Sequence, residues 1–101
     1  MTEEVNILAE EKTQYLKLAD GKEYELPIFN LTTLANIEKT MGFGLGRLQG
    51  KMEDETAQTM RLAIYAILKE TNPKLELEKA GDLVTFAEMK GVAEVLSKIW
   101  Q

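Results

Sequence analysis

The glycines between Gly42 and Gly50 are the first residues whose spacing could support chemistry, because closely spaced glycines let backbone N–H groups approach a phosphate. A dinucleotide-binding fingerprint requires G-x-G-x-x-G between a strand and a helix, whereas here a helical pattern comes first and the third glycine is one residue early. The Gly50-Lys51 pair also fails as a phosphate loop, since Leu45 replaces the first glycine and Met52 replaces the magnesium-binding Ser or Thr. We therefore expect a flexible loop and no nucleotide cofactor.

The acidic run Glu53-Asp54-Glu55 is a second group of side chains that could bind a ligand, in this case a hard cation. Consecutive residues at the start of a helix point in different directions, so the run cannot converge on an ion without ligands from elsewhere. Acidic side chains are also favoured at the positive end of a helix dipole. The run is therefore predicted to begin a helix, and no metal site is expected.

Two residue types that carry much of enzyme chemistry are missing, because the 101 residues include no histidine and no cysteine. The only serine is Ser97. The chain consequently has no imidazole base, no thiolate nucleophile and no Ser-His-Asp triad. A catalyst would have to be built from carboxylates, lysines and tyrosines, and so small a domain implies no cleft that pairs two carboxylates. We expect a protein that is not an enzyme and has no cofactor.

The charge pattern excludes other classes of partner. The net charge is −5, from 12 basic and 17 acidic residues, and the basic residues are spaced singly rather than clustered as phosphate binding requires. The first residues, MTEEVNILAEEK, are acidic where a secretory signal peptide is basic. No apolar segment approaches the roughly 20 residues of a membrane-spanning helix. We expect no nucleic-acid partner, no membrane partner and a cytoplasmic location.

Polar and apolar residues alternate from Thr13 to Ile28, which is the period of a β-strand. The Asp20-Gly21 pair interrupts the alternation and tolerates the positive φ angles of a tight turn, so the two halves are predicted to form an antiparallel hairpin. Pro27 cannot donate a ladder hydrogen bond and is expected to end the second strand. A two-stranded ribbon is marginal by itself and needs helices against its apolar face.

Helical spacing governs the rest of the chain. A first helix is predicted between an Asn30 cap and a Gly42 stop, and its apolar stripe is Leu31, Leu34, Ile37 and Met41. A short turn or a single helical turn is expected in the glycine-rich segment that follows. The acidic run then begins a central helix that is apolar over much of its circumference, with core positions at Met60, Ala63, Ile64, Ile67 and Leu68.

Two further helical segments complete the prediction. A short amphipathic piece spans Leu75 to Leu83, and a capping box of the form Thr85-x-x-Glu88 precedes the last helix. The apolar stripe of that helix is Phe86, Met89, Ala93, Leu96 and Trp100. The predicted fold class is α+β, mostly α, with an N-terminal antiparallel β-hairpin packed on a small helical bundle. Residues 1–12 are expected to be a flexible acidic leader, and residues 13–101 a single hairpin-plus-helices domain.

Apolar residues in and after the glycine-rich segment are candidates for partner binding, because so irregular a segment is not expected to bury all of them. They are Phe43, Leu45, Leu48 and Met52. The alternative is that these side chains close the base of the core. Trp100 has the same two interpretations, as the last layer of the core or as an interface anchor.

The order of these features can be followed from Tyr15 to Trp100. It begins with Tyr15-Leu16-x-Leu18-x-x-Gly21-x-x-Tyr24-x-Leu26 and Phe29-Asn30-Leu31-x-x-Leu34-x-x-Ile37-Glu38, then Gly42 and Leu48. It ends with the Met60-to-Leu68 helix, Asn72-Pro73, Leu75 to Leu83 and the terminal helix. In this layout the chain resembles the tail assembly chaperones of long-tailed bacteriophages and their prophages.

The resemblance implies a protein without an active site that works in the cytoplasm of the bacterial host. Such a protein coats the phage tape measure protein, helps to deliver tail tube protein, and leaves before the virion is mature. The resemblance also implies a longer product made by ribosomal frameshifting. From the residues themselves we further expect self-association through the apolar glycine-rich segment.

Two other classes of function stay open on the sequence. A small structural phage tail or connector protein would persist in purified particles. An acidic protein-binding regulator, such as an antitoxin, would be encoded beside its basic partner.

Overall fold

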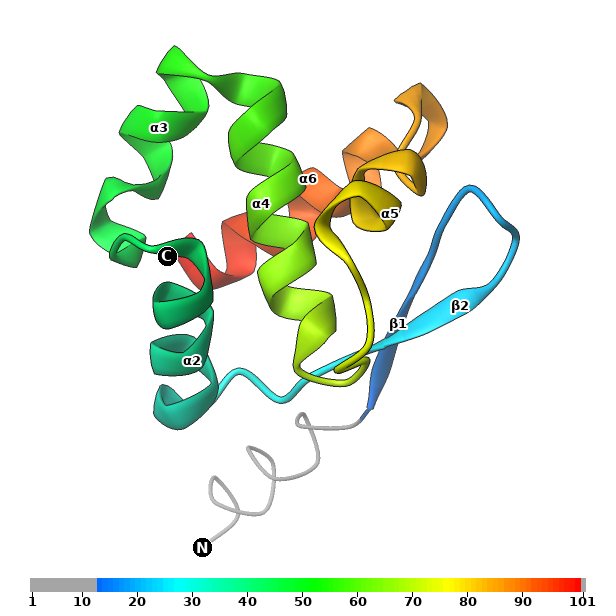
Figure 1. The fold of residues 1–101 in the computed structure, drawn as a ribbon, viewed down its shortest axis with the longest axis horizontal. Helices are drawn as coiled ribbons and strands as arrows, with labels where there is room; N and C mark the ends of the chain where they lie inside the picture. Colours follow the sequence, from blue (N-terminus) through cyan, green and yellow to red (C-terminus); the bar gives the residue numbers. More distant parts are fainter. Residues whose placement is uncertain (1–12, 101) are drawn as a thin grey trace, which may run out of the picture.

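A two-stranded hairpin is followed by a set of short helices, in agreement with the predicted α+β, mostly α, fold (Figure 1). The computed structural model describes residues 13–100, with side chains from 13 to 99, so the predicted leader 1–12 and the side chain of Trp100 lie outside the described residues. In chain order the elements are β1 (Gln14–Lys17), β2 (Glu23–Leu26), α2 (Leu31–Met41), the 3-10 turn η1 (Leu45–Arg47), α3 (Leu48–Asp54), α4 (Thr56–Lys69), α5 (Leu77–Asp82) and α6 (Phe86–Trp100).

The hairpin forms as predicted. β1 and β2 pair antiparallel with Leu16 opposite Tyr24, and β2 ends directly before Pro27. Gly21 adopts a φ of 82°, which a residue with a Cβ rarely adopts, and the Asp20 side chain accepts a hydrogen bond from the Lys22 N–H at 3.0 Å. The Asp-Gly pair therefore closes the turn.

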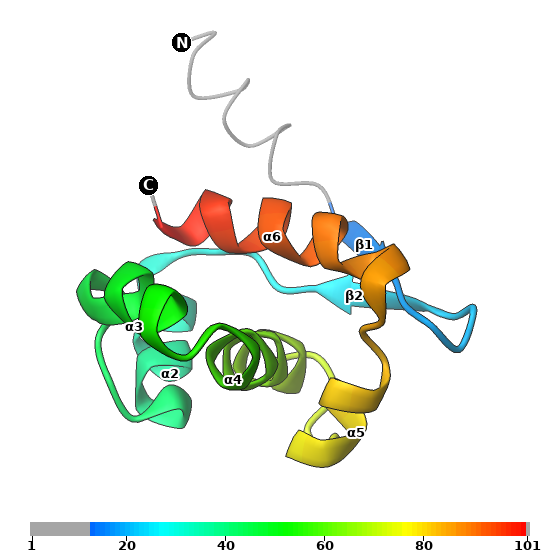
Figure 2. The same ribbon diagram turned by 90° about the horizontal axis from the view of Figure 1, so that it is seen from above.

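The apolar face of the hairpin packs on α6 (Figure 2). Leu16 and Leu18 are buried, and a Cβ at Gly91 of α6 would lie 3.3 Å from Leu16 Cδ1. The missing side chain at position 91 lets the strand approach the helix closely. The Ala19 N–H donates to the Leu83 carbonyl at 2.9 Å, which fixes the turn end of the hairpin to the segment before α6.

Helix α2 begins and ends where the sequence predicts. The Asn30 side chain accepts from the Thr33 N–H at 2.9 Å, and Gly42 closes the helix with a φ of 89°. The stripe prediction is wrong for Leu31, which is 82% exposed, whereas Ile37 is fully buried. Six residues separate the two, which places them about 120° apart around a helix, so they cannot both face the core.

The acidic run is the main correction to the predicted helices. Helix α3 continues through Gly50 to Asp54, so Glu53 and Asp54 end that helix instead of beginning the next one. Helix α4 starts at Thr56 and has no acidic residue in its first turn. The junction is stabilised by two threonines that donate to carbonyls at the end of α3: the Thr59 hydroxyl donates to the Lys51 carbonyl at 3.0 Å, and the Thr56 hydroxyl donates to the Met52 carbonyl.

Helix α4 is central, as its wide apolar arc predicts. It packs against α2, α3, α5, α6 and β2, which surround it on several sides (Figure 2). Its buried apolar residues are Ala63, Ile64, Ala66, Ile67 and Leu68. The two alanines leave room for neighbouring helices to approach the α4 backbone closely.

Helix α6 buries a different face from the predicted one. Its core residues are Val92, Val95, Leu96 and Ile99, which follow i, i+3, i+4 and i+7 spacing. Phe86 and Ala93 are exposed, so the predicted core stripe is wrong for both. Phe86 precedes Val92 by six residues and therefore lies about 120° from it around the helix. The Glu88 carboxylate does bond the Thr85 N–H at 2.8 Å, which is the glutamate half of the predicted capping box.

Candidate functional site

The residues predicted to bind a partner do not form one exposed patch. Leu48 is 2% exposed and belongs to the core, and Phe43, Leu45 and Met52 are half-buried and pack against it. This placement agrees with the alternative interpretation, in which the segment closes the base of the core. Trp100 ends α6, and its side chain lies outside the described residues.

The glycine-rich segment is also held in place more firmly than its composition suggests. The Glu38 side chain accepts a hydrogen bond from the Leu45 N–H at 2.8 Å, so it caps the turn η1. The Lys51 ammonium lies 5.3 Å from the centre of the Phe43 ring, a cation–π contact. Phe43 lines a hollow of about 370 Å³ together with residues of α3, α4 and α5.

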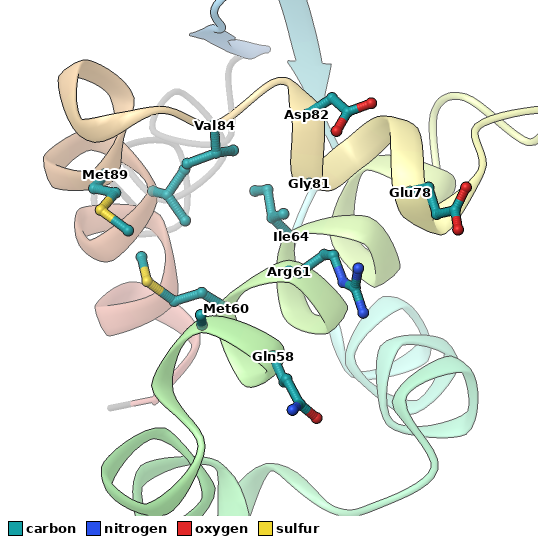
Figure 3. A pocket seen from close by; sticks show the side chains of 11 residues that line it. Gln58, Met60, Arg61, Ile64, Glu78, Gly81, Asp82, Val84 and Met89 are labelled. Atoms are coloured by element: carbon teal, nitrogen blue, oxygen red, sulfur yellow. The ribbon is translucent and has the colours of Figure 1, made fainter.

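A larger groove lies between α4, α5 and the beginning of α6, with a volume of about 570 Å³ (Figure 3). Apolar side chains from α4, from α6 and from the segment between α5 and α6 line it. The largest of them are Met60, Ile64, Val84, Met89 and Val92. Figure 3 shows Met60 and Met89 pointing toward one another from α4 and α6. Both are only partly buried, so their flexible thioether side chains lie between the core and solvent.

The rim of the groove carries both signs of charge. Arg61 comes from α4, and Glu78 and Asp82 come from α5. Arg61 lies against Gly81 of α5 so closely that a Cβ there would be 2.6 Å from Arg61 Cδ. The absence of a side chain at position 81 therefore lets the arginine stem pass over α5 at this edge of the groove.

Phe86 stands beside the groove and is the most exposed large apolar side chain among residues 13–99, at 91%. It follows the groove residue Val84 by two positions and precedes the groove residue Met89 by three. Residues three apart on a helix are neighbours on its surface. Phe86 therefore extends the apolar surface of the groove into solvent.

Among the described residues, the side chains with shifted pKa values take part in local turn and cap contacts and do not line the groove. The Tyr24 hydroxyl donates to Asp20 at 2.6 Å, which lowers the pKa of Asp20 and raises the pKa of Tyr24 to about 12. Hydrogen bonds from Thr85 lower the pKa of Glu88. Both arrangements are turn or cap contacts.

Within residues 13–99 no three acidic side chains are grouped so that they could hold a metal ion. In the same part of the chain no helix is both long and apolar enough to span a membrane. What the groove offers is an apolar floor, two adaptable methionines and a charged rim. An arrangement of this kind can bind apolar side chains presented by another helix.

The sequence prediction missed this groove because it assigned Met60 and Met89 to the core faces of their helices. The sequence does contain one indication of the groove. The apolar residues of the last helix cover a wider arc than a single core-facing stripe. Phe86, Met89 and Ala93 lie on one part of that arc, and Val92, Val95 and Ile99 on another.

Comparisons with protein-family models, with curated proteins and with solved structures find no match to this chain.

Proposed function

We propose that the protein is a non-catalytic chaperone that holds an amphipathic helix of its partner in the groove between α4, α5 and α6. The observation that carries the proposal is this groove, in which the half-buried side chains of Met60, Val84 and Met89 lie beside the buried Ile64 and Val92 in a small acidic protein. A helix docking there would insert side chains at i, i+3 or i+4 spacing between Met60 and Met89.

The resemblance to tail assembly chaperones supplies the partner in this proposal, the long helical tape measure protein of a phage tail. A coating protein meets many different apolar side chains along such a helix. Methionine suits that task because its unbranched side chain adapts to different shapes at little cost. In this proposal the protein acts in the cytoplasm of the bacterial host, also meets the tail tube protein, and leaves the tail before the virion is mature.

Coexpression with a tape measure protein, where the genome encodes one downstream, tests the proposal. Wild-type protein is expected to keep the tape measure protein soluble, and the double variant M60Q/M89Q to lose most of that effect. Glutamine has nearly the shape of methionine but is polar, so it weakens apolar binding while changing packing little. The matched variant is M52Q, since Met52 is also half-buried, lies outside this groove and belongs to the other candidate binding surface. Loss of solubilisation by M52Q but not by M60Q/M89Q would place the binding site in the glycine-rich segment instead.

The outcomes separate the alternatives. Equal solubilisation by wild type and M60Q/M89Q, with circular dichroism showing both folded, would show that this groove is not the binding site. No solubilisation by the wild-type protein would contradict the chaperone function itself. Stoichiometric recovery of the protein in purified phage particles would favour a structural tail or connector protein instead.

A further inference from the structure

The structure places an exposed apolar anchor directly beside an apolar receptor. Phe86 is 91% exposed at the first position of α6, and the groove lined by Met60 and Met89 begins within one helical turn of it. A phenylalanine that is exposed to this degree contributes almost nothing to the fold of its own chain. Its side chain is of a size that the groove, at about 570 Å³, can accept.

An anchor and its receptor that share one surface patch form a self-complementary surface. A two-fold axis between them brings the Phe86 of each copy to the groove of the other, and both contacts form at once. Methionine sulfur also makes favourable contacts with aromatic rings, so Met60 and Met89 are suited to surround a phenylalanine.

The charges at the rim agree with this pairing. Arg61 lies on α4, while Glu78 and Asp82 lie on α5. In a two-fold dimer the rims of the two grooves run antiparallel to each other. The arginine of one copy can then approach the acidic residues of the other copy. A rim with charges of one sign would repel its own copy, whereas this rim carries both.

We propose that two copies of this chain form a two-fold dimer in which Phe86 of each copy inserts into the groove between α4, α5 and α6 of the other. The dimer is a property of the protein alone and does not depend on the proposed chaperone function. If both hold, the second copy occupies the groove until a partner helix displaces it.

Sedimentation equilibrium of the full chain over a range of concentrations tests the dimer. The wild-type protein is expected to reach a dimer and not to grow further as the concentration rises. F86S should weaken the dimer by roughly tenfold or more, as the loss of a central aromatic anchor does. The matched control is L31S, because Leu31 is also the first residue of a helix and is 82% exposed. L31S should dimerise as well as the wild type.

The receptor side has its own variant. M60Q/M89Q keeps Phe86 but weakens the groove, and F86S keeps the groove but lacks the anchor. A mixture of the two should form a mixed dimer that is tighter than the dimer of either variant alone, because it restores one of the two contacts. Circular dichroism of each variant confirms that it is folded.

Four results would overturn the proposal. They are a wild-type protein that stays monomeric at all concentrations, a dimer that F86S leaves unchanged, a dimer that L31S weakens as much as F86S does, and continued growth beyond the dimer. The last result would indicate a head-to-tail contact that does not close. Because these measurements use the protein alone, their failure would leave the coexpression result for the chaperone function unaffected.

Discussion

Replacing Gly81 with alanine tests whether Arg61 lies across α5 at the rim of the groove. A Cβ at position 81 would lie 2.6 Å from Arg61 Cδ and 3.1 Å from Arg61 Cγ, both closer than ordinary van der Waals contact. To stay in this position the arginine would have to hold its χ angles about 30° off a rotamer, at a cost of about 0.5–1.5 kcal/mol. Alanine favours helix over glycine by up to about 1 kcal/mol, and position 81 is within a helix.

In the wild-type background the two effects nearly cancel, so we expect G81A to change the free energy of unfolding by less than about 0.5 kcal/mol. In an R61A background the steric cost disappears, and G81A should stabilise the protein by about 0.5–1 kcal/mol. Urea denaturation of the four proteins gives the coupling energy, which we expect to be about 1 kcal/mol. Additivity within about 0.3 kcal/mol would refute the contact between Arg61 and Gly81.

Two further predictions concern the core and the hairpin. Ile67→Ala should lower the free energy of unfolding by about 2–5 kcal/mol because the side chain is fully buried. Phe86→Ala should change it by less than about 0.5 kcal/mol at concentrations where the protein is monomeric, and urea denaturation measures both. Tyr24 should ionise with a pKa of about 12, above its ordinary value of 10.0, in an ultraviolet absorbance titration. Since the folded pKa is raised, the stabilisation is present below pH 10 and is lost as the pH rises toward 12. Asp20→Asn should move this pKa back toward its ordinary value, and an unchanged titration would contradict the Asp20 contact.

Much of the fold could be predicted because its local signals are strong. The Asp20-Gly21 turn, the Asn30 cap and the Gly42 stop each have a direct physical cause in one or two residues, and each is observed. The central position of α4 followed from an apolar arc too wide for a single contact face. The hairpin and the helix boundaries that depend on such signals were therefore predicted well.

The junction between α3 and α4 could not be predicted from local charge. Acidic residues favour the start of a helix. In the structure, however, α3 continues through Gly50, and Glu53 and Asp54 are its last two residues. The contact that stabilises this arrangement joins the Thr59 hydroxyl to the Lys51 carbonyl, eight residues earlier in the chain. The stabilisation from this hydrogen bond depends on how α3 and α4 meet. Helix propensity is a property of single residues and gives no information about such a contact.

The burial of the candidate residues could not be predicted for a related reason. Phe43, Leu45 and Leu48 lie in a glycine-rich segment, and a high glycine content predicts irregular and exposed structure. Glu38 caps this segment through the Leu45 N–H, seven residues away in the chain. Only the folded chain brings that carboxylate to the turn, so the apolar residues there could pack against the core.

The last helix shows how core and interface residues can be distinguished in a sequence of this kind. One core-facing stripe is accounted for by Val92, Val95 and Ile99, which are buried. Phe86 and Met89 lie on a second apolar arc, outside the buried core residues. Met89 lines the groove between α4, α5 and α6. A large apolar side chain that lies beyond the core face lowers solubility without stabilising the fold of its own chain, and both proposals therefore place Phe86 and Met89 at an interface. In these proposals α6 has two roles: one face closes the core, and the other binds a second chain.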